Sequence, residues 1–217
     1  MSPKKKTKAP TRKDETFRDT IKAVARDLYV RRGYAGFSFG DIVAVTGTTR
    51  ANVHHHFGNK LKLMDELVAD IVSDAEARIG SHWCEGRARF SERLDRQVDD
   101  LRSFYARYNT RPGERNVWSP LSRLRLDIPV LGRLAVRALE RIDRVYDEAL
   151  TRAVGEAIAS GEFRKDTPVA EVARLVRFTV QSCAPMTQDT GGFDALDSLF
   201  RSLGRTLAAA WGRKSRG

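Results

Sequence analysis

Cysteine is scarce in this chain, and the sequence contains no long apolar run. Its two cysteines, Cys84 and Cys183, are too few for the disulfide framework of a small secreted domain. No apolar run approaches the ~20 residues that a helix needs to cross a bilayer, and the lysine-rich N-terminus lacks the apolar stretch of a signal peptide. We therefore expect a cytoplasmic protein with no membrane partner. Buried or idle cysteines are favoured over redox-sensing ones.

Motifs of catalysis and of phosphate binding are missing as well. No G-x-S-x-G, P-loop or G-x-G-x-x-G pattern occurs, and the acidic residues are spread among arginines, as is typical of solvated ion pairs. His54, His55 and His56 are consecutive, but successive helical residues point about 100° apart and cannot converge on one metal ion. The sequence therefore predicts no enzyme, no metal site and no cofactor, with an enzyme on a helical scaffold as a remote alternative.

The alternating pattern of a β-strand is also absent, whereas apolar residues recur at helical spacing along most of the chain. This pattern predicts an all-α protein. Glycine and proline mark the breaks between helices, and the break over 80–89 is the expected domain boundary. The predicted helices cover residues 17–33, 38–46, 50–57, 60–79, 94–108, 119–127, 129–161, 168–186 and 193–211.

Positive charge is abundant and unevenly placed. The 217 residues carry a net charge of +11. Residues 1–60 hold 13 Lys or Arg against 5 Asp or Glu, a net +8, which leaves +3 for residues 61–217. A basic N-terminal part is the electrostatic signature of a protein that binds nucleic acid. The lysine-rich start, residues 1–13, is expected to be disordered and to act as an arm on DNA, with a solubilising tail as the alternative.

Residues 38–60 have the pattern of a helix-turn-helix. Ser38 and Asp41 are spaced as a capping box at the start of the first helix, and Gly47 suits the sharp turn that ends it. A threonine before Arg50 can cap the second helix. The apolar residues expected to face inward are Ile42, Val43, Val45, Ala51, Val53 and Phe57.

This stretch resembles the TetR family of transcriptional regulators over about 60 residues, together with 17–36 before it and 61–79 after it. The matching features are an RRGY run at 31–34, the Ser-x-x-Asp-Ile pattern at 38–42, and residues 53–60, which read VHHHFGNK. The chain departs from the family at Phe37, where a small threonine or serine is usual. It also has three histidines where the family usually has Tyr-His-Tyr.

The pattern and the resemblance together predict the DNA-binding residues. Arg50 and Asn52 open the recognition helix and suit guanine and adenine edges respectively. His55 and Lys60 are assigned to phosphate. The full predicted set is Ser38, Thr48, Thr49, Arg50, Asn52, His54, His55 and Lys60, with Lys4, Lys5, Lys6 and Arg12 from the arm.

The resemblance also implies a second domain that dimerises and binds a small molecule. Helices 168–186 and 193–211 are apolar over a wide arc, which favours a homodimer over a helix buried in a monomer. Aromatic residues between helices are candidates for the pocket. Arginine at 102, 123 or 125 would suit a carboxylate or an acyl thioester, but ordinary surface arginines are the favoured interpretation. The predicted pocket residues are Phe104, Tyr108, Trp118, Tyr146 and Phe178.

The resulting hypothesis is a homodimeric transcriptional repressor that an unidentified small molecule releases from its operator. The alternative is a basic, DNA-coating protein of low sequence specificity that binds no ligand. The predicted organisation is a disordered arm (1–13), a three-helix helix-turn-helix domain (14–60), a connecting helix (61–80) and a helical ligand-binding and dimerisation domain (81–217).

Overall fold

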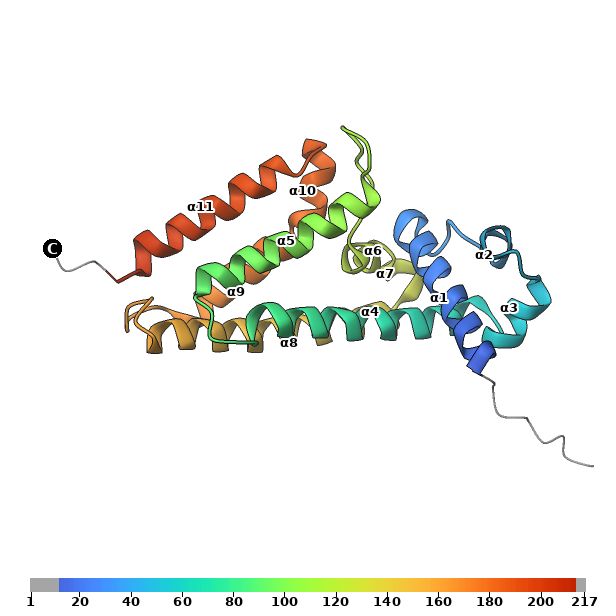
Figure 1. Ribbon diagram of the computed structural model, residues 1–217, viewed down its shortest axis with the longest axis horizontal. Helices are drawn as coiled ribbons and strands as arrows, with labels where there is room; N and C mark the ends of the chain where they lie inside the picture. Colours follow the sequence, from blue (N-terminus) through green and yellow to red (C-terminus); the bar gives the residue numbers. More distant parts are fainter. Residues whose placement is uncertain (1–11, 214–217) are drawn as a thin grey trace, which may run out of the picture. The chain divides into compact units, whose positions relative to one another are not determined.

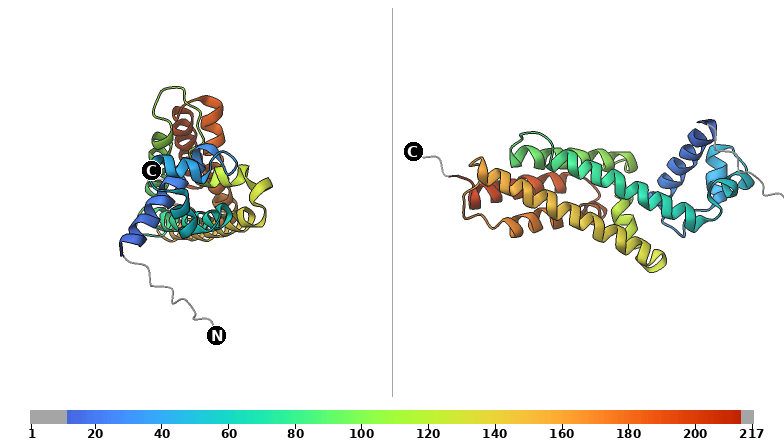
Figure 2. Two further views of the ribbon diagram at one scale, coloured as in Figure 1. Left: turned by 90° about the vertical axis from the view of Figure 1, so that its right-hand side faces the viewer. Right: turned by 90° about the horizontal axis from the view of Figure 1, so that it is seen from below.

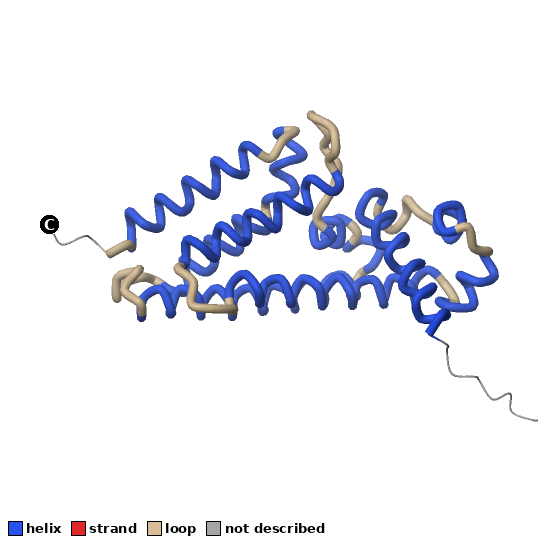
Figure 3. The backbone as a smooth tube through the Cα atoms, viewed as in Figure 1, coloured by secondary structure: helices blue, strands red, loops and turns tan. Residues whose placement is uncertain are grey.

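The computed structural model describes residues 12–213, with side chains from residue 16 onward. Every regular element in this part of the chain is a helix (Figures 1 and 3), apart from one isolated bridge between Phe163 and Gly212. The all-α prediction is confirmed. The chain divides into two compact units, Met1–Leu67 and Val68–Gly217. Among the described residues, no helix combines the length and the apolarity that a membrane crossing requires.

The first unit contains α1 (Arg12–Arg32), α2 (Phe39–Thr46), α3 (Arg50–Phe57) and the start of α4 (Lys60–Trp83). Its core includes fully buried residues from each helix, among them Ile21, Ile42, Val53 and Leu63. Residues 1–11 of the predicted arm lie outside the described residues. The last two, Arg12 and Lys13, open α1 and are therefore helical, contrary to expectation.

Two residues of the predicted inward set point to solvent instead. Val45 is 63% exposed, because Phe39 and Ile42 define the buried face of α2 and Val45 lies well around the helix from it. Ala51 is also exposed. It lies two residues, or about 160° around the helix, from Val53, which is fully buried.

The second unit contains the rest of α4 and seven further helices. Two tryptophans, Trp83 and Trp118, are almost completely buried within it. Helix α9 packs along α8, and α11 packs on α5 (Figures 1 and 2). The helices are α5 (Phe90–Tyr108), α6 (Pro120–Leu126), α7 (Ile128–Leu131), α8 (Arg133–Ala159), α9 (Val169–Gln181), α10 (Cys183–Thr190) and α11 (Asp194–Trp211).

Two predicted helices are broken in the structure. The helix expected over 129–161 is interrupted at Gly132, whose φ of 53° is a conformation that glycine adopts without a Cβ clash. The helix expected over 168–186 divides at Ser182 into α9 and α10. Pro185 accounts for this break, because it has no N–H to donate to the carbonyl of Gln181 and its ring crowds that carbonyl.

The division between the units also differs from the expected one. It falls between residues 67 and 68, inside the continuous helix α4, rather than over 80–89. Lys60 and Glu66 of this helix bond to residues of the first unit. Glu76 and Arg78 pair with residues of the second unit. The first part of helix α4 therefore belongs to the first unit and the rest to the second, whereas the sequence predicted a separate connecting helix.

Candidate DNA-binding surface and effector pocket

A complete capping box fixes the start of α2, as the sequence predicts. The backbone N–H of Asp41 donates to the Ser38 hydroxyl (3.3 Å), while the N–H of Ser38 donates to the Asp41 carboxylate (2.8 Å). Arg32 of α1 also donates to this carboxylate at 2.9 Å. The Ser38 hydroxyl itself donates to the carboxylate at 2.6 Å. These hydrogen bonds, with that of the Ser38 hydroxyl first, lower the pKa of Asp41, because each stabilises the charged form.

The turn that follows positions α3. Gly47 has a φ of 69° and donates its N–H to the carbonyl of Val43 at 2.9 Å, which ends α2. The Thr49 hydroxyl then accepts from the backbone N–H of Asn52 at 3.2 Å and caps α3. The side-chain amide of Asn52 donates to the Thr48 hydroxyl at 3.0 Å. Thr48, Thr49 and Asn52 therefore share one local network at the start of α3.

Arg50 and His55 are exposed on α3. The Arg50 guanidinium lies beside the start of α2, where a Cβ built on Gly40 would be 2.7 Å from its Nη2 and 3.3 Å from the Ser38 hydroxyl oxygen. Glycine at position 40 therefore leaves the room that Arg50 occupies. The structure thus brings Ser38 and Arg50, two predicted DNA contacts, to the same place.

The three histidines of α3 have different surroundings. The His54 ring lies edge-on to Phe39 at 4.8 Å between centroids, and its Nδ1 is 2.8 Å from the carbonyl oxygen of Gly58. His56 is half-buried, with its ring 6.0 Å from that of Phe17. His55 is exposed, and its ring lies 5.6 Å from that of His56. Across residues 12–213, no three His, Cys, Asp or Glu side chains are grouped in a way that could hold a metal ion.

Lys60 points inward, which differs from its predicted role. Its ammonium group donates to the backbone carbonyls of Tyr34 and Phe37 and lies 4.4 and 4.3 Å from the centroids of their rings. Lys60 therefore holds the connection between α1 and α2 against the start of α4, and the assignment of its ammonium group to a DNA phosphate is corrected. Lys4, Lys5 and Lys6 lie outside the described residues, and for Arg12 only the helical backbone is described.

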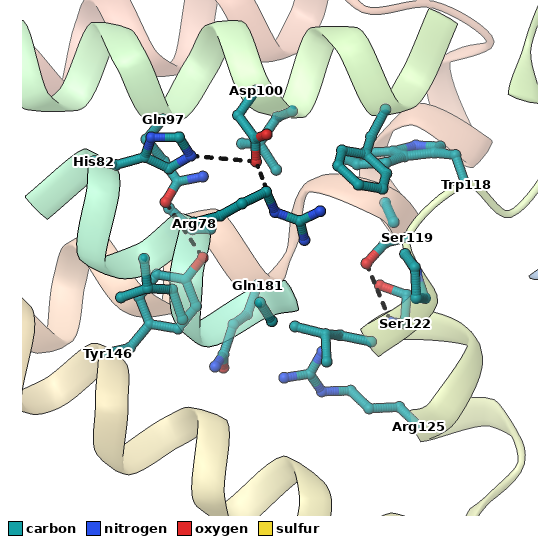
Figure 4. Close-up of a pocket in the computed structure, with 18 residues that line it drawn as sticks. Arg78, His82, Gln97, Asp100, Trp118, Ser119, Ser122, Arg125, Tyr146 and Gln181 are labelled. Carbon is teal, nitrogen blue, oxygen red and sulfur yellow. Dashed lines mark hydrogen bonds and ion pairs between the residues drawn. The ribbon is translucent and has the colours of Figure 1, made fainter. Parts of the chain in front are cut away.

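The second unit contains a cavity of about 50 Å³, here called the central pocket. Its walls come from α4, α5, α6, α8, α9 and α10 (Figure 4). Three of the five predicted pocket residues line it: Phe104, Trp118 and Tyr146. The other two predicted residues do not border this cavity: Tyr108 is buried and Phe178 is 53% exposed.

A buried glutamine organises one wall of the central pocket. Gln97 is 1% exposed, and its Oε1 accepts from Trp83 Nε1 (3.1 Å) and from the Tyr146 hydroxyl (3.2 Å). Burial raises the pKa of Tyr146, so this hydroxyl remains a donor. Sequence reasoning missed Gln97, although it stands among Leu94, Val98 and Leu101 on an apolar helix face. A polar residue at a buried position of an apolar helix face could have indicated a hydrogen-bonded site in the interior.

A carboxylate, an imidazole and two guanidinium groups line the same pocket. Asp100 lies 3.5 Å from Arg78 and 3.4 Å from His82, and Arg125 lines the pocket from α6 (Figure 4). Of the three arginines considered from the sequence, only Arg125 borders the cavity. The Arg102 guanidinium instead forms a two-point pair with Asp197, at 2.9 and 2.6 Å.

The two cysteines differ in their exposure to solvent. Cys183 is buried, and its thiol donates to the carbonyl of Thr179 at 3.2 Å. Burial raises the pKa of Cys183 to about 12, so the reactive thiolate is scarce at neutral pH. A redox role for Cys183 is therefore not supported, while Cys84 is half-exposed.

The chain is similar to known regulators. Residues 21–67 match the family described as "Bacterial regulatory proteins, tetR family". The HTH-type transcriptional regulator CymR of Pseudomonas putida is 31% identical over 109 residues, which are 48% of this chain and 50% of CymR. The chain thus spans about half the length of this curated relative. QacR of Staphylococcus aureus, another HTH-type transcriptional regulator, is 27% identical over 66 residues, covering 30% of this chain and 33% of QacR.

The similarity in structure extends further along the chain. A TetR-family transcriptional regulator from Agrobacterium tumefaciens is 25% identical, with a TM-score of 0.75. The match covers 88% of this chain and 98% of the other. The structural similarity therefore includes the second unit as well as the helix-turn-helix.

Proposed function

The chain belongs to the tetR family of bacterial regulatory proteins, and we propose that it is a homodimeric transcriptional repressor that a small molecule releases from its DNA operator. The observation that carries this proposal is the geometry of α3. This helix is fixed at its start by the Thr49 cap and exposes Arg50 and His55. A capped helix with exposed basic residues, in the more basic part of the chain, suits the major groove of DNA.

Arg50 is the residue we assign to base recognition, because its guanidinium can donate two hydrogen bonds to one guanine edge. Asn52 is assigned to an adenine edge, for which its amide must leave the Thr48 hydroxyl. His55 is assigned to phosphate. The basic residues 1–11 add positive charge that would follow the DNA backbone.

We assign the dimer interface to the exposed faces of α9 and α11. Leu175 and Phe178 of α9 are 44% and 53% exposed, which is unusual for two large apolar residues on one helix face. The outer face of α11 carries small residues such as Ser202 and Ala209, which allow another helix to approach closely. A second copy of the chain would cover these faces, and two recognition helices would then read two half-sites.

Helix α4 is the route by which a ligand would act on DNA binding. Its start, at Lys60, is bonded to the connection between α1 and α2. Its later residues Arg78 and His82 line the central pocket. A ligand that displaces this part of α4 would change the position of the two recognition helices. A coupling of ~1–3 kcal/mol is typical for two sites linked in this way, and it must be reciprocal.

The alternative of a DNA-coating protein without sequence preference is not favoured, because the family consists of regulators. The test is to select bound sequences from random duplex DNA with the full chain and to footprint the winning site. We expect a two-fold symmetric site, whose half-sites are separated by a multiple of about 34–36 Å. Binding without any sequence preference would refute the proposal.

A further inference from the structure

Arg125 is the one charged group of the central pocket without a carboxylate partner inside it. Asp100 is shared between Arg78 and His82. The nearest acid to Arg125 is Asp143, which lies outside the pocket with its Oδ1 4.0 Å from Arg125 Nη2. That carboxylate is already engaged, because it accepts from the Gln181 amide at 2.6 Å and lies 3.5 Å from Arg177.

The guanidinium of Arg125 is thus partly removed from water and poorly compensated. Within the described part of the chain it donates no hydrogen bond to another group, although a guanidinium has five N–H donors in a planar fork. Burial is the main influence on its pKa, which is lowered, with Asp143 opposing the shift. A guanidinium stays charged in proteins, and the Arg125 side chain is 33% exposed, so its charge is solvated only in part and is available to pair with an anion.

Part of the lining of the central pocket is apolar. The indole N–H of Trp118 donates to the Thr187 hydroxyl at 2.7 Å, so the rest of this ring offers carbon surface to the cavity. Phe104 and Leu101 extend the apolar wall. Figure 4 shows Arg125 and Arg78 directed into the space that Trp118 also borders. A ligand that complements both the guanidinium groups and the apolar wall has an anionic group at one end and a hydrocarbon body at the other.

From this arrangement we propose that the effector of the central pocket is a small organic carboxylate, bound to Arg125 through its carboxylate and to Trp118 and Phe104 through its hydrocarbon body. A carboxylate matches the planar fork of a guanidinium with two parallel hydrogen bonds. The inference rests on the proposed function, because it names the ligand class of the site through which that function would be regulated.

The volume of the cavity limits the size of the ligand, and a ligand larger than the cavity must move the residues that line it. A dry cavity of about 150 Å³ can hold benzene, whereas the central pocket encloses about 50 Å³. Both a short-chain acid and an aromatic acid must therefore displace wall residues, and the aromatic acid must displace them further. Arg78 and His82 of α4 belong to that wall, so the larger acid is expected to act more strongly on α4.

The test is calorimetric titration of the full chain with sodium butyrate and sodium benzoate at constant ionic strength. Butyramide, benzamide and benzyltrimethylammonium have similar bodies without the negative charge, and inorganic phosphate has the charge without the body. We expect a carboxylate to bind at least tenfold more tightly than its amide, and the other two compounds not to bind. If neither acid exceeds its amide, the inference is overturned.

Substitutions of Arg125 test whether the carboxylate of the ligand binds to this residue. Arg125→Gln should weaken binding by about 10- to 100-fold, the loss expected for hydrogen bonds to a charged group. Arg125→Lys should restore part of the affinity, because it keeps the charge without the fork. Arg123→Gln, on the same helix but outside the pocket, is the matched control and should bind as the original chain does. Equal affinity in Arg125→Gln and Arg123→Gln, with unfolding temperatures unchanged, would refute the assignment.

Operator binding, measured in the same samples, separates this inference from the proposed function. Carboxylate binding that leaves the affinity for the operator unchanged would support the ligand class and refute regulation through the pocket. Sequence-specific operator binding without any carboxylate binding would support the DNA-binding role and refute the ligand class. Release of the operator by benzoate, lost in Arg125→Gln alone, would support both.

Discussion

In the first unit, the polar residues of the proposed DNA-binding surface bond mostly to partners three or four positions away, as Ser38 does with Asp41 and Asn52 with Thr48. In the second unit, the polar residues of the central pocket come from five helices, and Gln97 bonds to partners 14 and 49 residues away. The hydrogen bonds of the proposed DNA-binding surface are local, so a short segment of chain can form them. The hydrogen bonds of the central pocket are long-range, so they form only when several helices have packed together.

The largest expected effect lies at the surface where the second unit would meet its copy. Phe178→Asp should convert a dimer into a monomer, because an unpaired carboxylate would be buried in the interface. Loss of the second recognition helix should weaken operator binding by about 10²–10⁴-fold. Sedimentation and an operator titration measure the two effects. Leu126→Asp, at a residue exposed to 58% on α6, is the control and should leave a dimer.

A long-range bond in the interior gives the next largest effect. Gln97→Leu leaves the donors of Trp83 and Tyr146 without their acceptor, at a cost of about 1–3 kcal/mol for each buried group. Chemical denaturation of the full chain measures the loss. Gln188→Leu, at a half-buried glutamine of the same unit whose amide donates to the Arg115 carbonyl at 3.4 Å, should lower the free energy of unfolding by about 1 kcal/mol or less. Equal effects of the two substitutions would contradict the contrast between the units.

We assign base recognition to the first unit alone. Arg50→Ala should cost about 1–3 kcal/mol in operator affinity and relax the preference at one base position of each half-site. His55→Ala should instead weaken all sequences alike, since we assign it to phosphate. Binding to a panel of single-base operator variants distinguishes the two patterns. If Arg50→Ala retains the original ranking of sites, another residue reads that base.

The smallest change in stability is expected at the capping box. Ser38→Ala removes the cap of α2 at a cost of about 1 kcal/mol. Hydrogen exchange of the α2 amides in the full chain measures this loss, and the amides around Gln97 serve as the internal control. An equal loss of amide protection in both units would show that the capping box stabilises the whole chain rather than α2 alone.

Acid should weaken the same helix end. The pKa of Asp41 is lowered in the folded chain, first by the Ser38 hydroxyl, so its contribution is present above the unfolded pKa of about 3.9 and is lost as the pH falls through the folded value. Protection of the α2 amides should therefore decrease in acid below about pH 4. Asp41→Asn should remove this pH dependence, and an unchanged profile in that variant would assign it to another carboxylate.

Much of the first unit could be predicted from the sequence. The capping box at Ser38, the turn at Gly47 and the bounds of α3 are confirmed, because each depends on residues within a few positions of one another. Val45 and Ala51 were misplaced, since their burial depends on which face of a short helix meets its neighbours. Lys60 was misassigned for a similar reason, because its partners lie 23 and 26 residues earlier in the chain.

The sequence by itself determined the all-α fold and the helix-turn-helix pattern of residues 38–60, because helical periodicity, caps and glycine turns depend on residues that are close together in the chain. The tertiary structure alone decided that Arg125 enters the central pocket while Arg102 pairs with Asp197, and that Phe178 stays outside it. These residues all stand on similar amphipathic helices. Whether such a side chain meets a cavity, a carboxylate or solvent depends on how helices distant in sequence pack together, which no local pattern specifies.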